Sequence, residues 1–173
     1  ADVSGHGLPA ALQVRDIYMG LRMGMARDFK IVRTVERLNQ IIHKSTLTSR
    51  FVSMFYGELE PNGVFIYVNA GHPAPFHLSA TGDVRNLDEG GPVLGPLAEA
   101  TYERGFIRLN PGDMVVLYTD GMIEATPAGS DGGEEFGIER LVEIARRLRG
   151  KSSKEIAETM MRAVEAYRGE GEA

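Results

Sequence analysis

Two aspartates have the local sequence expected of metal ligands. Asp2 precedes the glycine-rich segment 4–7, and Asp120 follows the apolar run 114–118 and precedes Gly121. We expect both carboxylates at strand ends, where glycine lets the backbone approach a ligand closely. Oxygen ligands of this type suit hard cations such as Mg²⁺ and Mn²⁺. An Asp-Gly pair at a strand end is also a common turn, so these residues alone leave a metal site and a plain turn both open.

Three other patterns suggest chemistry, and each lacks a required feature. Residues 5–10 fit the dinucleotide fingerprint G-x-G-x-x-A, but that fingerprint needs a following strand that ends in an acid, and 25–28 lies between two helices. Residues 145–152 nearly match a P-loop, but a helix precedes them where a strand is required. Ser4 near His6 lacks an orienting acid. We therefore reject nucleotide binding and a serine nucleophile.

Helical periodicity marks the two ends of the chain. Spacings of three and four predict one helix over 8–26 and a second over 30–46, with Asp28 as the N-cap of the second. The apolar stripe of the first contains Ala11, Val14, Tyr18, Leu21 and Met25, and that of the second contains Ile31, Val35, Leu38 and Ile42. Two more helices close the chain, with stripes at Ile138, Leu141, Val142, Ala145 and Leu148, and at Ile156, Met160, Ala163 and Tyr167. We expect Gly150 at the C-cap of the third helix, and Ser152 with Glu155 to form a capping box on the fourth.

The middle of the chain reads as about six strands joined by short turns. Runs at 51–57 and 64–69 flank the turn residues 61–63 and predict an antiparallel hairpin. Further runs cover 76–79, 103–109 and 114–118, and a Gly/Pro-rich connector spans 90–96. Short turns indicate antiparallel pairing, because parallel neighbours need long crossovers. The order of elements predicts an α+β domain.

Composition narrows the functional classes. The chain has 173 residues, is 43% hydrophobic and has a formal net charge of −5, which is typical of one globular domain and argues against a nucleic-acid partner. With no cysteine, thiol catalysis and thiolate metal sites are excluded. No apolar run reaches the roughly 18 residues of a membrane span, so we expect a cytoplasmic protein without membrane contact. The basic run 146–151 reads as cations opposing a helix dipole rather than as a phosphate site.

Several sequence blocks together resemble the signature of one protein family. Residues 1–11, 51–57, 67–75 and 111–121 are similar to the SpoIIE/RsbU-type branch of the PPM (type 2C-like) serine/threonine phosphatases. The segment 134–137 and the helix after it also match. These blocks occur in the family's order and cover nearly the whole chain. The resemblance favours the interpretation of Asp2 and Asp120 as metal ligands over their interpretation as turn residues.

This resemblance implies a fold and a metal centre. The fold would be a four-layer α/β/β/α sandwich, with two central antiparallel sheets flanked by helix pairs. Two manganese or magnesium ions would lie between the sheets. Asp2 would bridge both ions, the carbonyl of Val3 would bind one, and Asp120 would bind the other.

Two departures from the family pattern lead to a further expectation. An upstream acidic ligand segment and a downstream Asp-Asp-x-Thr strand have no counterpart in this sequence. We therefore expect residues 1–173 to be a single PPM-type domain truncated at both ends, which alone binds metal poorly and has little activity. Relatives from eukaryotes have a general-acid histidine where this chain has Ser4, so that role is not transferred to His6.

The remaining histidines and one glutamate have less specific interpretations. His6 is either a loop residue or a contact to phosphate or solvent near the metals. His72 shapes a strand-ending turn, and His43 and His77 are structural. Glu124 would share a helical face with Asp120, either as a local charge partner or as an accessory contact.

By resemblance, the function is that of a metal-dependent protein serine/threonine phosphatase. Metal-activated water would dephosphorylate a regulator of the anti-anti-sigma type. A sensor domain N-terminal to this chain and a homodimer are further expectations from the resemblance. The alternative is a catalytically inactive pseudophosphatase that binds the same partner.

Overall fold

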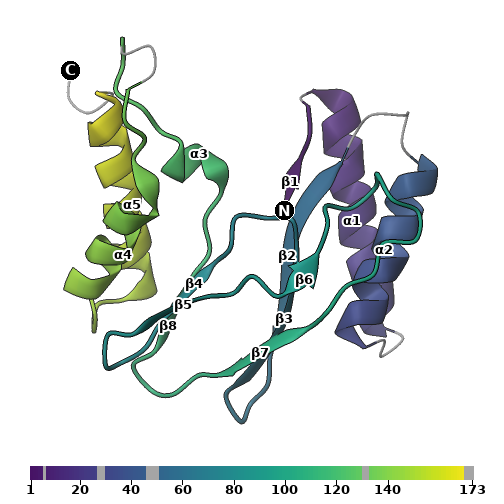
Figure 1. Ribbon diagram of the computed structural model, residues 1–173, viewed down its shortest axis with the longest axis horizontal. Coiled ribbons are helices and arrows are strands. Elements are labelled where there is room, and N and C mark those ends of the chain that lie inside the picture. The colour runs from purple at the N-terminus through teal and green to yellow at the C-terminus, as the bar shows by residue number, and fades with distance from the viewer. Residues whose placement is uncertain (6, 27–29, 46–50, 130–132, 170–173) are drawn as a thin grey trace. The chain divides into compact units, whose positions relative to one another are not determined.

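The computed structural model describes residues 1–5, 7–26, 30–45, 51–129 and 133–169 (Figure 1). The chain separates into two units. Unit 1 comprises Ala1–Ala74 and Asn86–Leu109, and unit 2 comprises Pro75–Arg85 and Asn110–Ala173. The predicted N-cap at Asp28 lies outside the described residues. Each unit contains a sheet and a pair of longer helices.

The sheet of unit 1 is built around a hairpin. Its strands are β1 (Asp2–Val3), β2 (Val52–Leu59), β3 (Val64–Ala70), β6 (Gly90–Gly91) and β7 (Gly105–Arg108). They run in the order β1-β2-β3-β6, and β7 also pairs with β3. β2 and β3 are antiparallel from Met54↔Ala70 to Leu59↔Phe65, and Gly63 takes the positive φ of 84° that their turn requires. The predicted hairpin is confirmed.

One pairing in this sheet differs from the predicted all-antiparallel arrangement. β6 lies parallel to β3, with Asn69 opposite Gly90 and Ala70 opposite Gly91. The stretch from Ala70 to Gly90 is long enough for the crossover that parallel neighbours need. A Cβ at Gly90 would lie 1.7 Å from the carbonyl oxygen of Asn69, so only glycine fits there. The predicted connector at 90–96 therefore contains a short strand.

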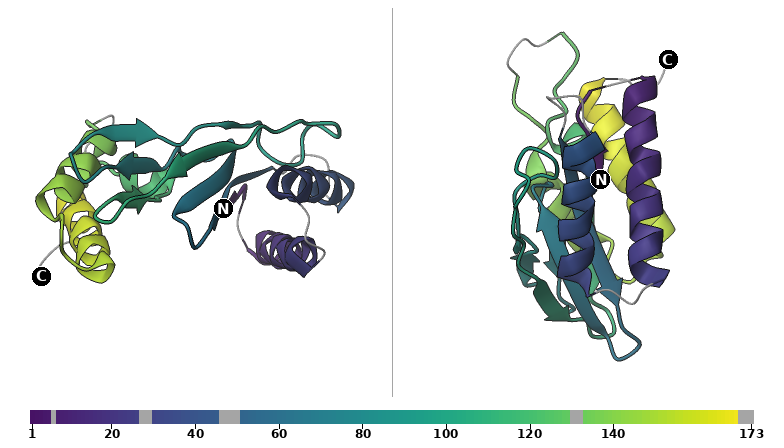
Figure 2. Two further views of the ribbon diagram at one scale, coloured as in Figure 1. Left: turned by 90° about the horizontal axis from the view of Figure 1, so that it is seen from below. Right: turned by 90° about the vertical axis from the view of Figure 1, so that its right-hand side faces the viewer.

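Two helices complete unit 1. α1 (Leu8–Ala26) and α2 (Ile31–Ser45) lie side by side (Figure 2), and α2 packs on β2 and β3. The predicted stripe of α2 is confirmed, because all four of its residues are buried. They join a core that also contains Val52, Met54 and Val68 from the sheet. This packing supports the expectation that both helices belong with one sheet.

The predicted apolar stripe of α1 is wrong in its first three residues, although Leu21 packs against the core as expected. Ala11, Val14 and Tyr18 are exposed, whereas Ala10 and Ile17 are buried. Two of these exposed side chains, Val14 and Tyr18, are each 55% accessible. α1 has apolar residues on more than one side, so periodicity predicts the helix but cannot select the side that meets α2.

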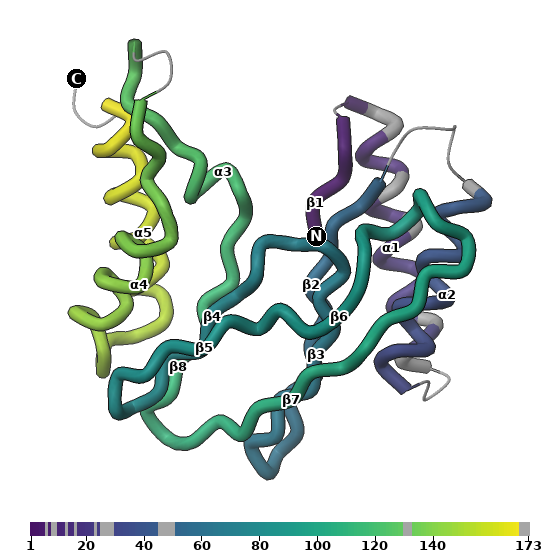
Figure 3. Tube along the Cα trace, viewed as in Figure 1, coloured from purple at the N-terminus to yellow at the C-terminus, as the bar shows by residue number. Residues whose placement is uncertain are grey.

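The sheet of unit 2 has three strands. β5 (Val84–Asn86), β4 (Phe76–Leu78) and β8 (Met114–Val116) run in that order, and β4 pairs antiparallel with β8. α4 (Gly137–Arg147) packs against β4 and against α5 (Ser153–Arg168). The short α3 (Asp120–Ile123) lies beside α4, as the trace in Figure 3 shows. The core of this unit includes Phe76, Tyr118, Leu141 and Met160.

Of the two helix-end predictions in unit 2, the N-terminal capping box of α5 is confirmed and the C-cap of α4 lies two residues earlier than predicted. Ser152 and Glu155 form the predicted capping box at the start of α5. α4 ends at Arg147 with Leu148 at its C-cap, two residues before the predicted Gly150. Gly150 nevertheless has a positive φ of 82°, so glycine is needed in the turn between the helices.

The fold is mixed α+β, as predicted. A second helix rather than a strand follows α1, and α4 precedes the P-loop-like segment, so neither nucleotide-binding motif has its required context. No helix within the described residues is long and apolar enough to cross a bilayer.

Candidate metal site

Asp2 and Val3 form β1, at the edge of the sheet of unit 1. Asp2 lies opposite Ser53, and Val3 lies opposite Val52. Ser4 extends this contact: its backbone N–H donates to the carbonyl of Phe51 at 3.0 Å, and its hydroxyl accepts from the N–H of Phe51 at 2.8 Å. The Ser4 hydroxyl therefore fixes the end of the strand, which agrees with rejecting it as a nucleophile.

The backbone carbonyl of Val3 points away from β2. The N–H and C=O groups of Val52 bond with Leu94, at 3.0 and 2.8 Å, and so point away from β1. In an antiparallel ladder, two opposite residues either bond with each other or both point outward. Val3 and Val52 are such an outward pair. The Val3 oxygen is therefore not used in the ladder with β2 and is available to a ligand on that side.

A buried polar network lies next to the cross-strand partner of Asp2. The hydroxyl of Ser53 is 2.9 Å from Nδ1 of His72, and His72 is only 9% exposed. The amide of Asn69 donates to the carbonyl of His72 at 2.9 Å, and its oxygen accepts from the His72 N–H at 2.8 Å. Because directly opposite residues share one face of a sheet, Ser53 and Asp2 lie on the same side. The interpretation of His72 as a turn residue is supported, and its ring also contacts the strand beside Asp2.

Asp120 begins a helical turn rather than ending a strand. β8 stops at Val116, and Thr119 is extended just before α3. The N–H of Glu124 donates to the carbonyl of Asp120 at 2.8 Å, which closes the turn. One carboxylate oxygen of Asp120 accepts from the N–H of Gly121 at 2.7 Å. The predicted position at a strand end is thus off by a few residues, because the Asp-Gly pair folds into the first turn of α3.

The structure describes one of the two further residues predicted near the metal site, Glu124 and His6. Glu124 is the C-cap of α3 and is exposed on the same helical turn as Asp120, as expected from their spacing. Its role as charge partner or accessory contact stays a prediction. His6 lies outside the described residues.

The donor types fit a hard divalent cation. Asp2, Val3 and Asp120 offer two carboxylates and one backbone carbonyl, which are the oxygen ligands that Mg²⁺ and Mn²⁺ prefer. Asp2 and Val3 belong to unit 1, and Asp120 belongs to unit 2. Within residues 1–5, 7–26, 30–45, 51–129 and 133–169, no three His, Asp or Glu side chains form a cluster that would hold an ion. The joint use of both aspartates by one metal site remains a proposal.

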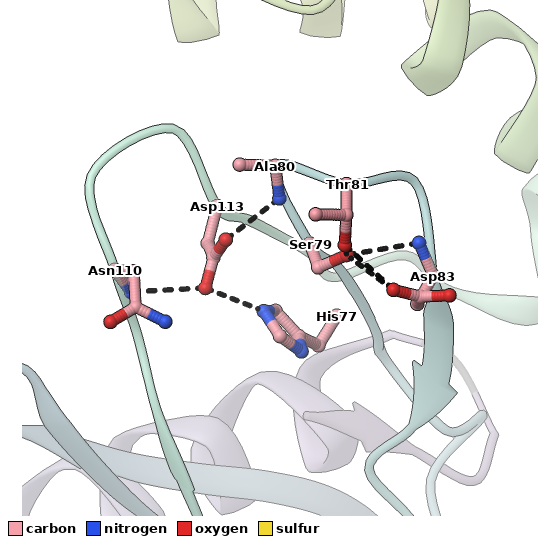
Figure 4. Close-up of polar contacts among 7 residues, drawn as sticks. All are labelled: His77, Ser79, Ala80, Thr81, Asp83, Asn110 and Asp113. Atoms are coloured by element: carbon pink, nitrogen blue, oxygen red, sulfur yellow. Dashed lines mark hydrogen bonds and ion pairs between the residues drawn. The ribbon is translucent and has the colours of Figure 1, made fainter.

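A second polar cluster in unit 2 has a structural role (Figure 4). Asp113 accepts from the N–H of Ala80 at 2.8 Å, from the N–H of Asn110 at 3.0 Å and from Nε2 of His77 at 3.1 Å. The side chain of Asp113 is 3% exposed. The hydrogen bond from Asn110, with those from Ala80 and His77, holds the pKa of Asp113 below its ordinary value, although burial opposes this shift. The structural interpretation of His77 is supported, and its partner is Asp113.

His43 is also structural. Its Nδ1 lies 2.7 Å from the carbonyl of Gly95. Asn39, one turn earlier on α2, bonds the N–H of Gly95 at 2.8 Å and the carbonyl of Leu97 at 2.8 Å. Together these side chains fasten the loop after β6 to α2.

The match to a known family identifies a PP2C-like phosphatase domain. The chain belongs to the family of Stage II sporulation protein E (SpoIIE), whose pattern it matches over residues 1–173. It is therefore a member of the SpoIIE/RsbU-type branch of the PPM phosphatases, as the sequence blocks predicted. Phosphoserine phosphatase RsbU of Bacillus subtilis is 31% identical over 126 residues, which cover 72% of this chain and 38% of RsbU.

Solved structures agree on the fold. The SiaA-PP2C domain of Pseudomonas aeruginosa has a TM-score of 0.78 at 19% identity, over 98% of this chain and 68% of that domain. The RsbU and RsbW domains of Rv1364c from Mycobacterium tuberculosis give a TM-score of 0.76 at 24% identity, over 94% of this chain and 46% of that one. The chain spans between 14% and 38% of the length of the curated relatives that it matches.

Proposed function

We propose that this chain is the catalytic part of a metal-dependent protein phosphatase that removes phosphate from phosphoserine or phosphothreonine. Family membership over residues 1–173 supports the class of reaction. The observation that carries the proposal is the donor set: Asp2 and the outward-pointing carbonyl of Val3 on one strand, and Asp120 at the start of a helical turn. All three donors are oxygens, the type of ligand that hard divalent cations prefer.

In this proposal two manganese or magnesium ions are bound by Asp2, the Val3 carbonyl and Asp120. When bound, a pair of such ions supplies a nucleophilic water near neutral pH and offsets the charge of the phosphoryl group. The chain's own contribution is to hold the ligands. β1 fixes the Asp2–Val3 backbone through its pairing with β2, and Gly121 fixes one oxygen of Asp120.

The substrate we propose is a phosphorylated regulator protein of the anti-anti-sigma type. RsbU, a relative at 31% identity, is named a phosphoserine phosphatase, and the similar protein Rv1364c combines an RsbU domain with an RsbW domain. We expect the protein to be cytoplasmic and to have a sensor domain outside these residues. We also expect it to form a homodimer.

Release of inorganic phosphate from a phosphoserine-containing regulator tests the proposal. With the full-length protein, we expect release with added Mn²⁺ or Mg²⁺ and none with EDTA. Residues 1–173 alone should bind Mn²⁺ poorly in a parallel titration. If the regulator binds equally well with and without EDTA and no phosphate is released, the chain is a pseudophosphatase instead.

A further inference from the structure

The last turn of α5 is fastened to the segment that follows Asp120. The guanidinium of Arg168 donates to the carbonyl of Gly121 at 2.6 Å. In return, the N–H of Ala128 donates to the carbonyl of Arg168 at 2.9 Å. These contacts join positions 47 and 40 residues apart in sequence, and all of them lie within unit 2.

Tyr167 and Arg140 strengthen the same attachment. The hydroxyl of Tyr167 donates to the carbonyl of Glu134 at 2.8 Å. Arg140 lies over the ring of Tyr167, 4.9 Å from its centroid, and donates to the carbonyls of Glu135 and Phe136. The described stretches 121–128 and 134–136 therefore each have a hydrogen bond to α5.

Arg168 binds Gly121, the residue of α3 whose backbone has the greatest intrinsic conformational freedom. Gly121 has no Cβ, and its backbone would otherwise sample many conformations. Its N–H donates to the carboxylate of Asp120, and its carbonyl is one of the helix-end groups that a short helix leaves without an internal partner. By binding that carbonyl, Arg168 fixes the glycine whose N–H orients the carboxylate.

We propose that Arg168 is a positioning residue for Asp120, acting through Gly121, so that the end of α5 sets the metal affinity of this carboxylate. The proposal rests on the proposed function, in which Asp120 binds a divalent ion. Removal of a group that hydrogen-bonds to a metal ligand and orients it typically lowers metal affinity or activity by about 10- to 100-fold. Gly121 is such a group, because its N–H donates to the carboxylate, and Arg168 acts one step further out by binding the Gly121 carbonyl.

Affinity for Mn²⁺, measured on the full-length protein by the electron paramagnetic resonance signal of free Mn²⁺, tests the proposal. Arg168→Met keeps the length of the side chain and removes the donors. We expect it to weaken Mn²⁺ binding about 10-fold or more. Arg168→Lys retains a donor and should recover most of the affinity. Arg162→Met is the matched control, because Arg162 lies on α5 and its guanidinium contacts Thr159 of the same helix.

A double mutant separates positioning from general destabilisation. If Arg168 acts through Asp120, Arg168→Met should weaken Mn²⁺ binding in the wild-type background and add nothing in an Asp120→Asn background. Equal weakening in both backgrounds, or no weakening in the wild type, would overturn the proposal. If Asp120→Asn itself leaves Mn²⁺ binding unchanged, the metal-site assignment fails and the positioning role fails with it. Urea unfolding of each variant confirms that it is folded.

Discussion

The carboxamide of Asn69 bonds both backbone groups of His72, accepting from its N–H at 2.8 Å and donating to its carbonyl at 2.9 Å. Asn69 is 5% exposed, so the two hydrogen bonds are formed away from water. They close the turn after β3 and hold the His72 ring where it meets Ser53, the cross-strand neighbour of Asp2. The turn after β3 therefore contacts β2 at the residue that lies opposite Asp2, a proposed metal ligand.

Replacing Asn69 by alanine should destabilise the protein. The change leaves the N–H and C=O of His72 without their side-chain partner in a buried turn, which costs about 1–3 kcal/mol. Urea unfolding monitored by circular dichroism measures the loss. Asn62→Ala is the control, because Asn62 also bonds a backbone N–H but lies in an exposed turn, where substitutions change stability by about 0.5 kcal/mol. Equal losses in the two variants would show that burial of the Asn69 contacts does not matter.

The Asp113 cluster should make stability depend on acid pH. Hydrogen bonds from Asn110 and Ala80, with the contact to His77, lower the pKa of Asp113 from its ordinary 3.8. An acid with a lowered pKa in the folded state contributes stability that is fully present above its unfolded pKa. That stability is lost as the pH falls through the folded pKa. At neutral pH, Asp113→Asn should therefore be less stable than the wild type by about 1–3 kcal/mol.

The test is the difference in unfolding free energy between the two proteins across pH. We expect this difference to be largest well above pH 3.8 and to shrink as the pH falls through that value and below it. Exposed Asp88 provides a control, since Asp88→Asn should leave the curve of the wild type unchanged. A difference between Asp113→Asn and wild type that stays the same through the acid range would show that the charge of Asp113 is not what stabilises the cluster.

Local sequence signals predicted the elements that depend on neighbouring residues. The β2–β3 hairpin follows from the turn at 61–63, and the start of α5 follows from the capping box at Ser152 and Glu155. The buried face of α1 and the strand at Gly90 could not be predicted in this way. Both depend on which distant element packs alongside, and neither periodicity nor glycine content identifies that neighbour.

The same distinction applies to the candidate site, where local motifs identified some residues and contacts between distant segments determined the others. The motifs located Asp2 and Asp120, and the structure shows how β1 and α3 hold each of them. Sequence reasoning missed Ser53 and Arg168, which contact His72 and Gly121. No local pattern marks either residue, since each contact joins segments that are distant in sequence. Asn69 had a signal, because asparagine shortly before glycine favours a turn.

The most direct test of the central claim is the rate of Mn²⁺-dependent phosphate release from a phosphoserine regulator by full-length Asp120→Asn. This substitution keeps the shape of the side chain and removes the charge that would bind the ion. Loss of several kcal/mol of metal-based stabilisation should reduce turnover about 10³-fold or more, while Asp88→Asn retains wild-type turnover. Turnover by Asp120→Asn close to that of the wild type, with the same dependence on Mn²⁺, would contradict the account.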